Sequence, residues 1–347
     1  MQDGKEYYFL QPASDQAISV AKILHDCSDV VIHAVLLKSE KQSAFLDKIY
    51  ESVIFVKDYK ELPEDSFIVP FGAQTTEARL KNGDVKLASV TMTQAALNVY
   101  EKPAFLNFCE KHNLPVPKTY INEEEISDTD FPIFYKQRYE KGGGVRGFAN
   151  NKQELPKTHK DELIYQEFIN TPGTYGVGFI ADKGVLVASF CHYEELSYPV
   201  SGGSAVVIHK VNDKRLKYLT EAFVKESSYS GWGLAEFKWC DKRHDYVYME
   251  VNAKFWASCE LAFRNEPVFI KKLFNIEIDK KEVEGLVYIN RALNAGLFNA
   301  AVTIIKNNKL EKIIYPGVFR SILVGMLPKP LIKSIKKIFL DPKRWLT

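Results

Sequence analysis

Residues 249–256 read MEVNAKFW, with polar side chains at alternate positions, and the strand pattern of residues 246–251 ends within this stretch. Successive side chains of a strand point to opposite faces, so Glu250 and Asn252 share one face. A second strand pattern, residues 233–239, lies just upstream and is joined to the first by a polar turn. Together they predict an antiparallel hairpin that brings Glu236 beside the other two side chains.

These three side chains offer two carboxylates and an amide oxygen. Hard oxygen ligands suit magnesium, whereas zinc prefers His and Cys. We therefore predict a metal site formed by Glu236, Glu250 and Asn252. The alternative is a hairpin whose polar side chains are simply solvated, because Glu and Asn are common on exposed hairpins.

A second group of residues with binding chemistry lies further upstream. The strand pattern of residues 133–136 ends on Lys136, and KGGGVRG follows at residues 141–147. Consecutive glycines let backbone N–H groups approach phosphate oxygens, and Lys and Arg add positive charge. The spacing does not match the Walker A pattern GxxxxGK[ST]. The segment predicts either a phosphate-binding loop or an ordinary surface hairpin loop.

The amino-terminal part alternates strand and helix patterns, which predicts a parallel α/β unit. No GxGxxG follows the first strand, so the dinucleotide-binding fingerprint is absent. The strand patterns are residues 7–10, 30–37, 53–56 and 67–69, and the helix patterns are residues 15–25, 40–50 and 93–113.

The middle of the chain changes to short strands separated by glycine turns, which predicts an antiparallel sheet. Within it, QEFI at residues 166–169 places an acid inside an apolar strand that ends at NTPG. The further strand patterns are residues 163–168, 175–180, 185–191 and 246–251, and a helix pattern covers residues 213–227.

Composition excludes several protein classes. The 347 residues are 46% hydrophobic and 26% charged, values typical of a globular chain of two or three domains. A net charge of +2 gives no indication of a nucleic-acid-binding protein. Five scattered cysteines without CxxC, and no leader or spanning segment, predict a cytoplasmic protein with reduced thiols.

Charge is unevenly distributed along the chain. Residues 301–347 hold ten basic and two acidic side chains, so the first 300 residues carry a net charge of −6. Residues 328–347 combine an apolar helical face with lysines on the other face. Such a helix either lies on an anionic bilayer as a peripheral contact or docks on its own domain.

Taken in order, these segments resemble the ATP-grasp superfamily, specifically its carboxylate–amine ligase-like branch with a carbamoyl-phosphate-synthase-like ATP-grasp domain. The resemblance runs from residue 100 to residue 256, and residues 249–256 are its strongest part. It is carried by residues 100–102, 114–117, Lys136 with its glycine loop, and residues 166–173, 198–204, 235–238 and 249–256.

The resemblance implies an α/β and α+β protein of three parts. A parallel α/β pre-ATP-grasp domain would cover residues 1–95. An ATP-grasp domain would cover residues 96–275, with subdomains of about 96–165 and 166–275. A helical extension with the basic amphipathic tail would complete the chain at residues 276–347.

The resemblance also implies roles for individual residues around ATP and Mg²⁺, which Mn²⁺ would be able to replace. Nucleotide contacts would come from Lys102, Lys136, Gly142, Gly143, Gly144, Glu167, Phe168 and Ile169. Magnesium would be held by Glu236, Glu250 and Asn252. Lys254 and Arg146 would stabilise the transition state, and the acid substrate would lie at Lys238, Ser201, Gly202, Gly203 and Ser204.

The expected activity is an ADP-forming ligation of a small-molecule carboxylate to an amine through an acyl phosphate. A cell-envelope or polysaccharide role would follow if the basic tail binds membrane. Two alternatives keep the same fold: a small-molecule kinase, and a nucleotide-binding scaffold without catalysis. The scaffold is suggested by Lys254 and Ser197, because the family usually has arginine at both positions.

Overall fold

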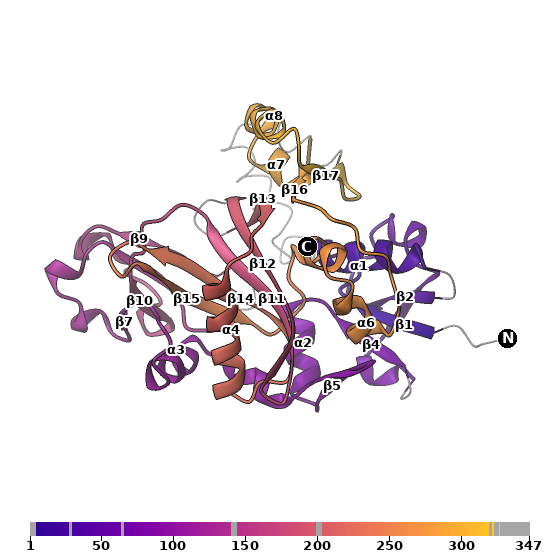
Figure 1. Ribbon diagram of the computed structural model, residues 1–347, viewed down its shortest axis with the longest axis horizontal. Helices are drawn as coiled ribbons and strands as arrows, with labels where there is room; N and C mark the ends of the chain where they lie inside the picture. Colours follow the sequence, from indigo (N-terminus) through magenta and orange to yellow (C-terminus); the bar gives the residue numbers. More distant parts are fainter. Residues whose placement is uncertain are drawn as a thin grey trace, which may run out of the picture.

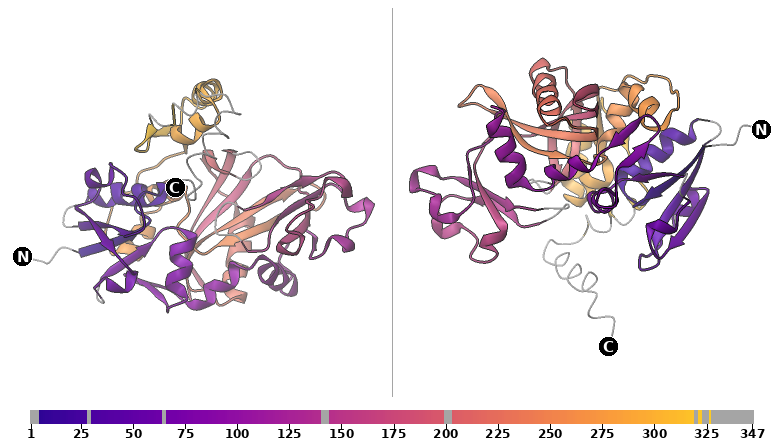
Figure 2. Two further views of the ribbon diagram at one scale, coloured as in Figure 1. Left: turned by 180° about the vertical axis from the view of Figure 1, so that it is seen from behind. Right: turned by 90° about the horizontal axis from the view of Figure 1, so that it is seen from below.

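Three larger sheets follow one another along the molecule, with the amino-terminal sheet at one end and a small antiparallel sheet at the other (Figures 1 and 2). The seven-stranded sheet lies between them. The computed structural model describes residues 5–27, 30–63, 66–139, 144–198, 203–318, 321, 322 and 326.

The chain begins with a parallel sheet of strand order β3-β2-β1-β4, as the alternating pattern predicts. Helix α1 buries Ile18, Ala21 and Leu24 in the core beside this sheet. The elements are β1 (Lys5–Leu10), α1 (Asp15–His25), β2 (Val30–Leu37), β3 (Ser52–Val56), β4 (Phe67–Pro70) and α2 (Ala73–Leu80), followed by the hairpin β5 (Val85–Leu87) and β6 (Val90–Met92).

The predicted helix at residues 40–50 is wrong, because only one 3₁₀ turn forms there, at Leu46–Lys48. The Glu40 carboxylate accepts a hydrogen bond from the backbone N–H of Leu37 in the turn that follows β2. The apolar side chains that produced the helical pattern are used in tertiary contacts instead. Tyr50, for example, is buried and donates its hydroxyl proton to the Pro12 carbonyl.

The predicted helix at residues 93–113 is divided in two. A 3₁₀ turn covers Gln94–Val99, and α3 covers Lys102–Lys111. Pro103 lacks the N–H that a continuous helix requires, so it is accommodated only in the first turn of α3. The division leaves Lys102 as the first residue of α3.

The small antiparallel sheet has the order β7-β10-β8-β9, and the large sheet has the order β15-β14-β11-β12-β13-β16-β17. Phe223 of α4 packs against Tyr248 on one face of the large sheet. The small sheet consists of β7 (Thr119–Tyr120), β8 (Ile133–Gln137), β9 (Arg146–Ala149) and β10 (Leu163–Glu167). The large sheet begins with β11 (Thr174–Asp182), β12 (Val185–Tyr198), β13 (Ser204–Lys210), β14 (Gly231–Cys240) and β15 (Asp245–Asn252), with α4 (Lys214–Glu226) between β13 and β14.

After α5 (Cys259–Asn265) and α6 (Val268–Phe274), the carboxyl-terminal segment returns to the large sheet. β16 (Gly285–Tyr288) pairs with β13, and β17 (Glu311–Ile313) pairs with β16. The helices α7 (Ile289–Asn294) and α8 (Leu297–Lys306) stand above that sheet edge in Figure 1. The expected helical extension is therefore only partly helical, and the basic tail at residues 328–347 lies outside the described residues.

Arg291 of α7 connects three parts of the molecule. Its guanidinium pairs with Asp15 of α1 at 2.7 Å and donates to the carbonyls of Ala205 and Ala257. It also lies over the ring of Tyr288, 3.9 Å from the centroid. Burying this cation is tolerated because an anion and two carbonyls satisfy it.

All five cysteines are free thiols, as the sequence predicts. Among the described helices, none has the length and apolar character needed to cross a membrane.

Candidate active site

The hairpin predicted from residues 233–251 forms, and its strands are β14 and β15. Glu236 stands directly opposite Glu250 in the register, and Asn252 lies two residues further along the same face. The register slips by one residue next to this pair, so that Met249 is the extra residue of a bulge. The three predicted oxygen ligands therefore lie side by side.

Asn252 connects the two carboxylates. Its amide nitrogen donates to Glu236 Oε1 at 3.1 Å and to Glu250 Oε1 at 2.8 Å. Two converging carboxylates that share a single amide donor form a site that a divalent cation would neutralise. The amide nitrogen of Asn252 faces the carboxylates, and a half-turn of the amide would bring its oxygen to the same place as a third hard ligand. The described residues contain no group of three His, Cys, Asp or Glu side chains at metal-binding spacing, so this set depends on the asparagine.

Two buried lysines approach the same place from other elements. Lys102 Nζ lies 3.6 Å from Glu250 Oε2, and Lys136 Nζ donates to the Met249 carbonyl at 2.9 Å. Lys102 begins α3 and Lys136 lies on β8, so the small sheet and the large sheet meet at these contacts. Lys254 follows Asn252 and adds a third positive charge that acts on both carboxylates.

The charges give the two carboxylates different pKa values. Burial alone would raise the pKa of Glu250, but the charges of Lys102 and Lys136 and the bond from Asn252 lower it to about 2. Burial raises the pKa of Glu236 well above its ordinary value, and the neighbouring Glu250 adds to the effect. Like charges in one site separate in this way when no cation lies between them.

Arg146 starts β9 directly opposite Lys136 of β8. The glycine-rich connection between the two strands is described from Gly144 onwards, and Gly144 has a positive φ of 72° that favours glycine. Gly142 and Gly143 lie outside the described residues. The two basic side chains thus flank the loop on paired strands.

The predicted hinge, residues 167–169, connects β10 of the small sheet to β11 of the large sheet. The Glu167 carboxylate accepts hydrogen bonds from the Arg243 guanidinium and from the Lys118 backbone N–H. Phe168 stacks on Phe148, with 5.7 Å between ring centroids. Ile169 is buried against the large sheet, so the hinge is fixed from both sides.

Among the described residues, Lys238 and Ser204 of the predicted acid pocket lie on strands that are not adjacent in the large sheet. Lys238 donates to the carbonyls of Thr171 and Gly173, beside the hinge. Ser204 is exposed at the start of β13, three strands away from β14, or about 14 Å at ~4.8 Å per strand. Gly203 precedes Ser204, whereas Ser201 and Gly202 lie outside the described residues. Burial lowers the pKa of Lys238.

Sequence reasoning missed two residues on the same sheet face. His192 of β12 stands opposite Gly176 of β11, which stands opposite Glu236 of β14. Glu194 lies two residues along β12 and adds to the negative charge that raises the pKa of Glu236. The alternation in HYE at residues 192–194 was the available signal, because positions two apart share a face.

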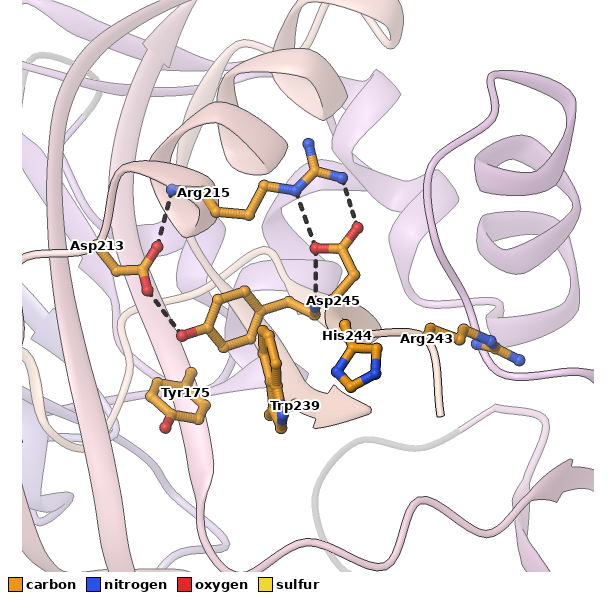
Figure 3. A pocket seen from close by; sticks show the side chains of 8 residues that line it. Tyr175, Asp213, Arg215, Trp239, Arg243, His244 and Asp245 are labelled. Carbon is orange, nitrogen blue, oxygen red and sulfur yellow. Dashed lines mark hydrogen bonds and ion pairs between the residues drawn. The ribbon is translucent and has the colours of Figure 1, made fainter. Parts of the chain in front are cut away.

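A surface pocket of about 800 Å³ lies on the opposite face of the large sheet (Figure 3). Tyr175 and Trp239 line this pocket. Each is the sequence neighbour of a residue on the face that carries Glu236, namely Gly176 and Lys238, and successive residues of a strand point to opposite faces. Its charged groups already have partners: the Arg215 guanidinium pairs with Asp245 (Figure 3), and Arg243 pairs with Glu167. The pocket is therefore separate from the candidate active site.

No protein-family model matches the sequence, and no curated protein matches it in sequence. Solved structures do match in fold. A biotin carboxylase domain dimer of Hydrogenobacter thermophilus 2-oxoglutarate carboxylase, in complex with MgADP, ADP and bicarbonate, is 14% identical, with a TM-score of 0.59 over 79% of this chain and 69% of that one.

Two further structures give the same result. An L-amino acid ligase from Bacillus licheniformis is 12% identical, with a TM-score of 0.56 over 79% of this chain and 74% of that one. A phosphoribosylglycinamide synthetase from Anaerococcus prevotii is 14% identical, with a TM-score of 0.55 over 76% and 72%. With the sheets, the hairpin and the lysine contacts described above, these likenesses show that the chain has the ATP-grasp fold.

Proposed function

We propose that this chain is an ATP- and magnesium-dependent carboxylate–amine ligase. One observation carries the proposal: Glu236, Glu250 and Asn252 converge with Lys102, Lys136 and Lys254 where the two sheets meet. Catalysis of phosphoryl transfer depends mainly on positioning the reactants and neutralising the phosphate charge, and this set of cations and hard oxygen ligands would supply both.

The reaction takes place in two steps. An oxygen of the substrate carboxylate attacks the γ-phosphorus of ATP, the bond from that phosphorus to the β-phosphate oxygen breaks, and ADP leaves. The amine nitrogen then attacks the acyl carbon, the bond to the phosphate oxygen breaks, and phosphate leaves as the nitrogen loses its proton. The product is an amide.

Residues of this chain have distinct parts in the first step. Lys102 and Lys136 would bind phosphate oxygens, with Gly142, Gly143 and Gly144 closing over them. Lys254 and Arg146 would offset the charge that develops on the transferring group. The backbone of Glu167, Phe168 and Ile169 would hold the adenine.

Glu236, Glu250 and Asn252 would hold Mg²⁺, which neutralises phosphate charge and keeps the triphosphate in place. Mn²⁺ takes similar oxygen ligands, and we expect it to substitute. The MgADP in the biotin carboxylase domain of similar fold supports this use of the site.

Two alternatives share this site. A small-molecule kinase would stop after phosphoryl transfer to a hydroxyl group, so its ADP release would need no amine, and its phosphate ester would not react with hydroxylamine. A nucleotide-binding scaffold would bind ATP without turnover. The ligase is favoured because the metal set is complete and three solved structures of similar fold carry the names of carboxylase, ligase and synthetase enzymes.

The decisive test is ADP release with ATP and Mg²⁺ over a panel of amino acids and sugar acids, with hydroxylamine present to trap acyl phosphate as hydroxamate. We expect one class of acid to stimulate release and to give hydroxamate. Glu250→Gln should lower the rate by about 100-fold or more, because it removes a metal ligand. Glu284→Gln, a similar change at an exposed position, should leave it unaltered.

Binding of ATP without acid-stimulated release would contradict the ligase and favour the scaffold. Acid-stimulated release without hydroxamate would favour the kinase.

We also propose a cytoplasmic location with peripheral membrane contact through the basic tail, and through it a role in cell-envelope or polysaccharide assembly. The supporting observation is the concentration of positive charge in residues 301–347.

A further inference from the structure

Glu194 and His192 lie on the same sheet face as the candidate metal site, but on the far side of β11. In the register, Glu236, Gly176 and His192 form one row across β14, β11 and β12. Gly176 leaves room for the His192 imidazole, because a Cβ at that position would lie 2.5 Å from His192 Nε2. The imidazole therefore lies over β11, towards the carboxylates.

Glu194 is mostly buried without a cation to pair with. Its side chain is 16% exposed, and its oxygens lie 3.5 Å from His192 Nε2 and 3.4 Å from the Ser197 hydroxyl. No lysine or arginine of the described chain forms an ion pair with it. A carboxylate removed from water in this way is costly unless a positive group comes to it.

The nearest basic residue by register is engaged elsewhere. Lys210 of β13 stands opposite His192, but its ammonium lies 3.9 Å from Glu284. His192 itself is 1% exposed, and its Nε2 is 3.3 Å from the Ser258 hydroxyl. His192 thus helps to hold the Glu194 carboxylate in a fixed position, and the partly exposed carboxylate is the acceptor on this side of the site.

The charges are separated across the sheet. Lys102, Lys136 and Lys254 gather around Glu250 at the β15 side, where they attract phosphate and carboxylate groups. Glu194 lies on β12, three strands away from β15, and contributes negative potential at Glu236. A substrate with an anionic and a cationic end would be oriented by this polarity, with its cation at β12.

We propose that Glu194, held in place by His192, forms the subsite for the ammonium group of the amine substrate. The inference rests on the proposed ligase function, and it identifies the amine as one that is positively charged at neutral pH. Glu194 would pair with the ammonium. Since the nitrogen must lose a proton before it attacks, this carboxylate is the acceptor at hand.

The test compares two nucleophiles on the same enzyme and acid. Hydroxylamine is uncharged at neutral pH and does not require an ammonium subsite, whereas amino acids and glucosamine are cationic. Phosphate release is measured against the concentration of each amine, and hydroxamate is measured with hydroxylamine. Thermal unfolding of each variant shows whether the fold is retained.

For Glu194→Gln we expect the KM for the cationic amine to rise about tenfold or more, because a charge-assisted hydrogen bond is lost. Hydroxamate formation should fall far less. Glu194→Asp should recover part of the affinity. The matched control is Glu195→Gln, whose carboxylate pairs with His209 on the opposite face of β12 and which should leave the KM unaltered.

Equal losses with both nucleophiles would overturn the inference and assign Glu194 to the metal or to the fold. An unaltered amine KM would overturn it as well. Absence of acid-dependent hydroxamate in the wild-type protein would overturn the proposed function itself. The ammonium subsite would then be overturned too, because it rests on that function.

Discussion

Two glutamates that face each other across one strand pair have opposite protonation behaviour. Two lysines surround Glu250 and hold its pKa at about 2, against the effect of burial. Burial and the charge of Glu250 raise the pKa of Glu236. In the protein without metal, Glu236 therefore disfavours the folded state at neutral pH, whereas Glu250 favours it.

The direction in which stability changes with pH follows from the difference in proton binding between the folded and unfolded states. A raised folded pKa at Glu236 means that stability decreases as pH rises from about 4.5 through the raised value. A lowered folded pKa at Glu250 contributes stability that is present above about 4.5 and is lost as pH falls towards 2.

We predict that Glu236→Gln stabilises the metal-free protein at pH 7 by about 1 kcal/mol or more, since one pKa unit corresponds to about 1.4 kcal/mol. The same change should remove the stabilisation that Mg²⁺ gives to the wild-type protein. Urea unfolding with and without Mg²⁺ measures both effects. A variant less stable than wild type without metal would contradict the repulsion between the carboxylates.

The positions of Glu236, Glu250 and Asn252 could be predicted from the sequence because strand alternation and one polar turn determine them. The contact from Lys136 to the Met249 carbonyl could not, because it joins two sheets and depends on a bulge. Glu194 was missed because its neighbours on the sheet face come from other strands.

At the scale of elements, β11 is shaped by two glycines that face the site. Gly178 stands opposite Leu234 of β14, which stands opposite Asn252 of β15. A Cβ at Gly178 would lie 2.1 Å from the Trp256 ring, so the glycine makes room for the indole beside the metal-binding strand.

We predict that Gly178→Ala destabilises the protein by about 1–3 kcal/mol, the usual range for overpacking a core. Trp256→Phe should relieve the clash, because the contacting atoms belong to the part of the indole that phenylalanine lacks. The Trp256 ring nitrogen has no hydrogen-bond partner among the described residues, so the replacement loses none there. Additive effects in the double-mutant cycle would contradict the contact.

Periodicity predicted the elements well where local pattern and tertiary contacts agree. The helix at Asp15–His25 and the strands at Val30–Leu37 and Phe67–Pro70 follow the expected ranges closely. It failed at residues 40–50 and 93–113, where tertiary contacts such as that of Tyr50 with the Pro12 carbonyl, and a proline, respectively, decide the conformation. The spacing of apolar residues carries no information on either.

At the scale of the whole molecule, the carboxyl-terminal segment belongs to the central sheet. β16 pairs with β13 although about 80 residues separate them in sequence, and no local pattern indicates such a pairing. Beyond it, α8 presents apolar side chains to solvent: Phe298 is 80% exposed and Ile305 is 72% exposed. The basic residues of the chain's end follow this helix in sequence.

Exposed apolar side chains next to a run of lysines are typical of a surface that binds anionic lipid, and each basic residue contributes about 1 kcal/mol near such a surface. We predict that the full chain floats with vesicles containing phosphatidylglycerol and much less with pure phosphatidylcholine. A chain ending at Pro328 should lose most of this binding. The double variant Phe298→Asp, Ile305→Asp should bind these vesicles more weakly. Its remaining binding should still decrease as salt is added, because the lysines that attract anionic lipid are retained. If the full chain stays in the soluble fraction with both kinds of vesicle, the basic tail instead docks on its own domain.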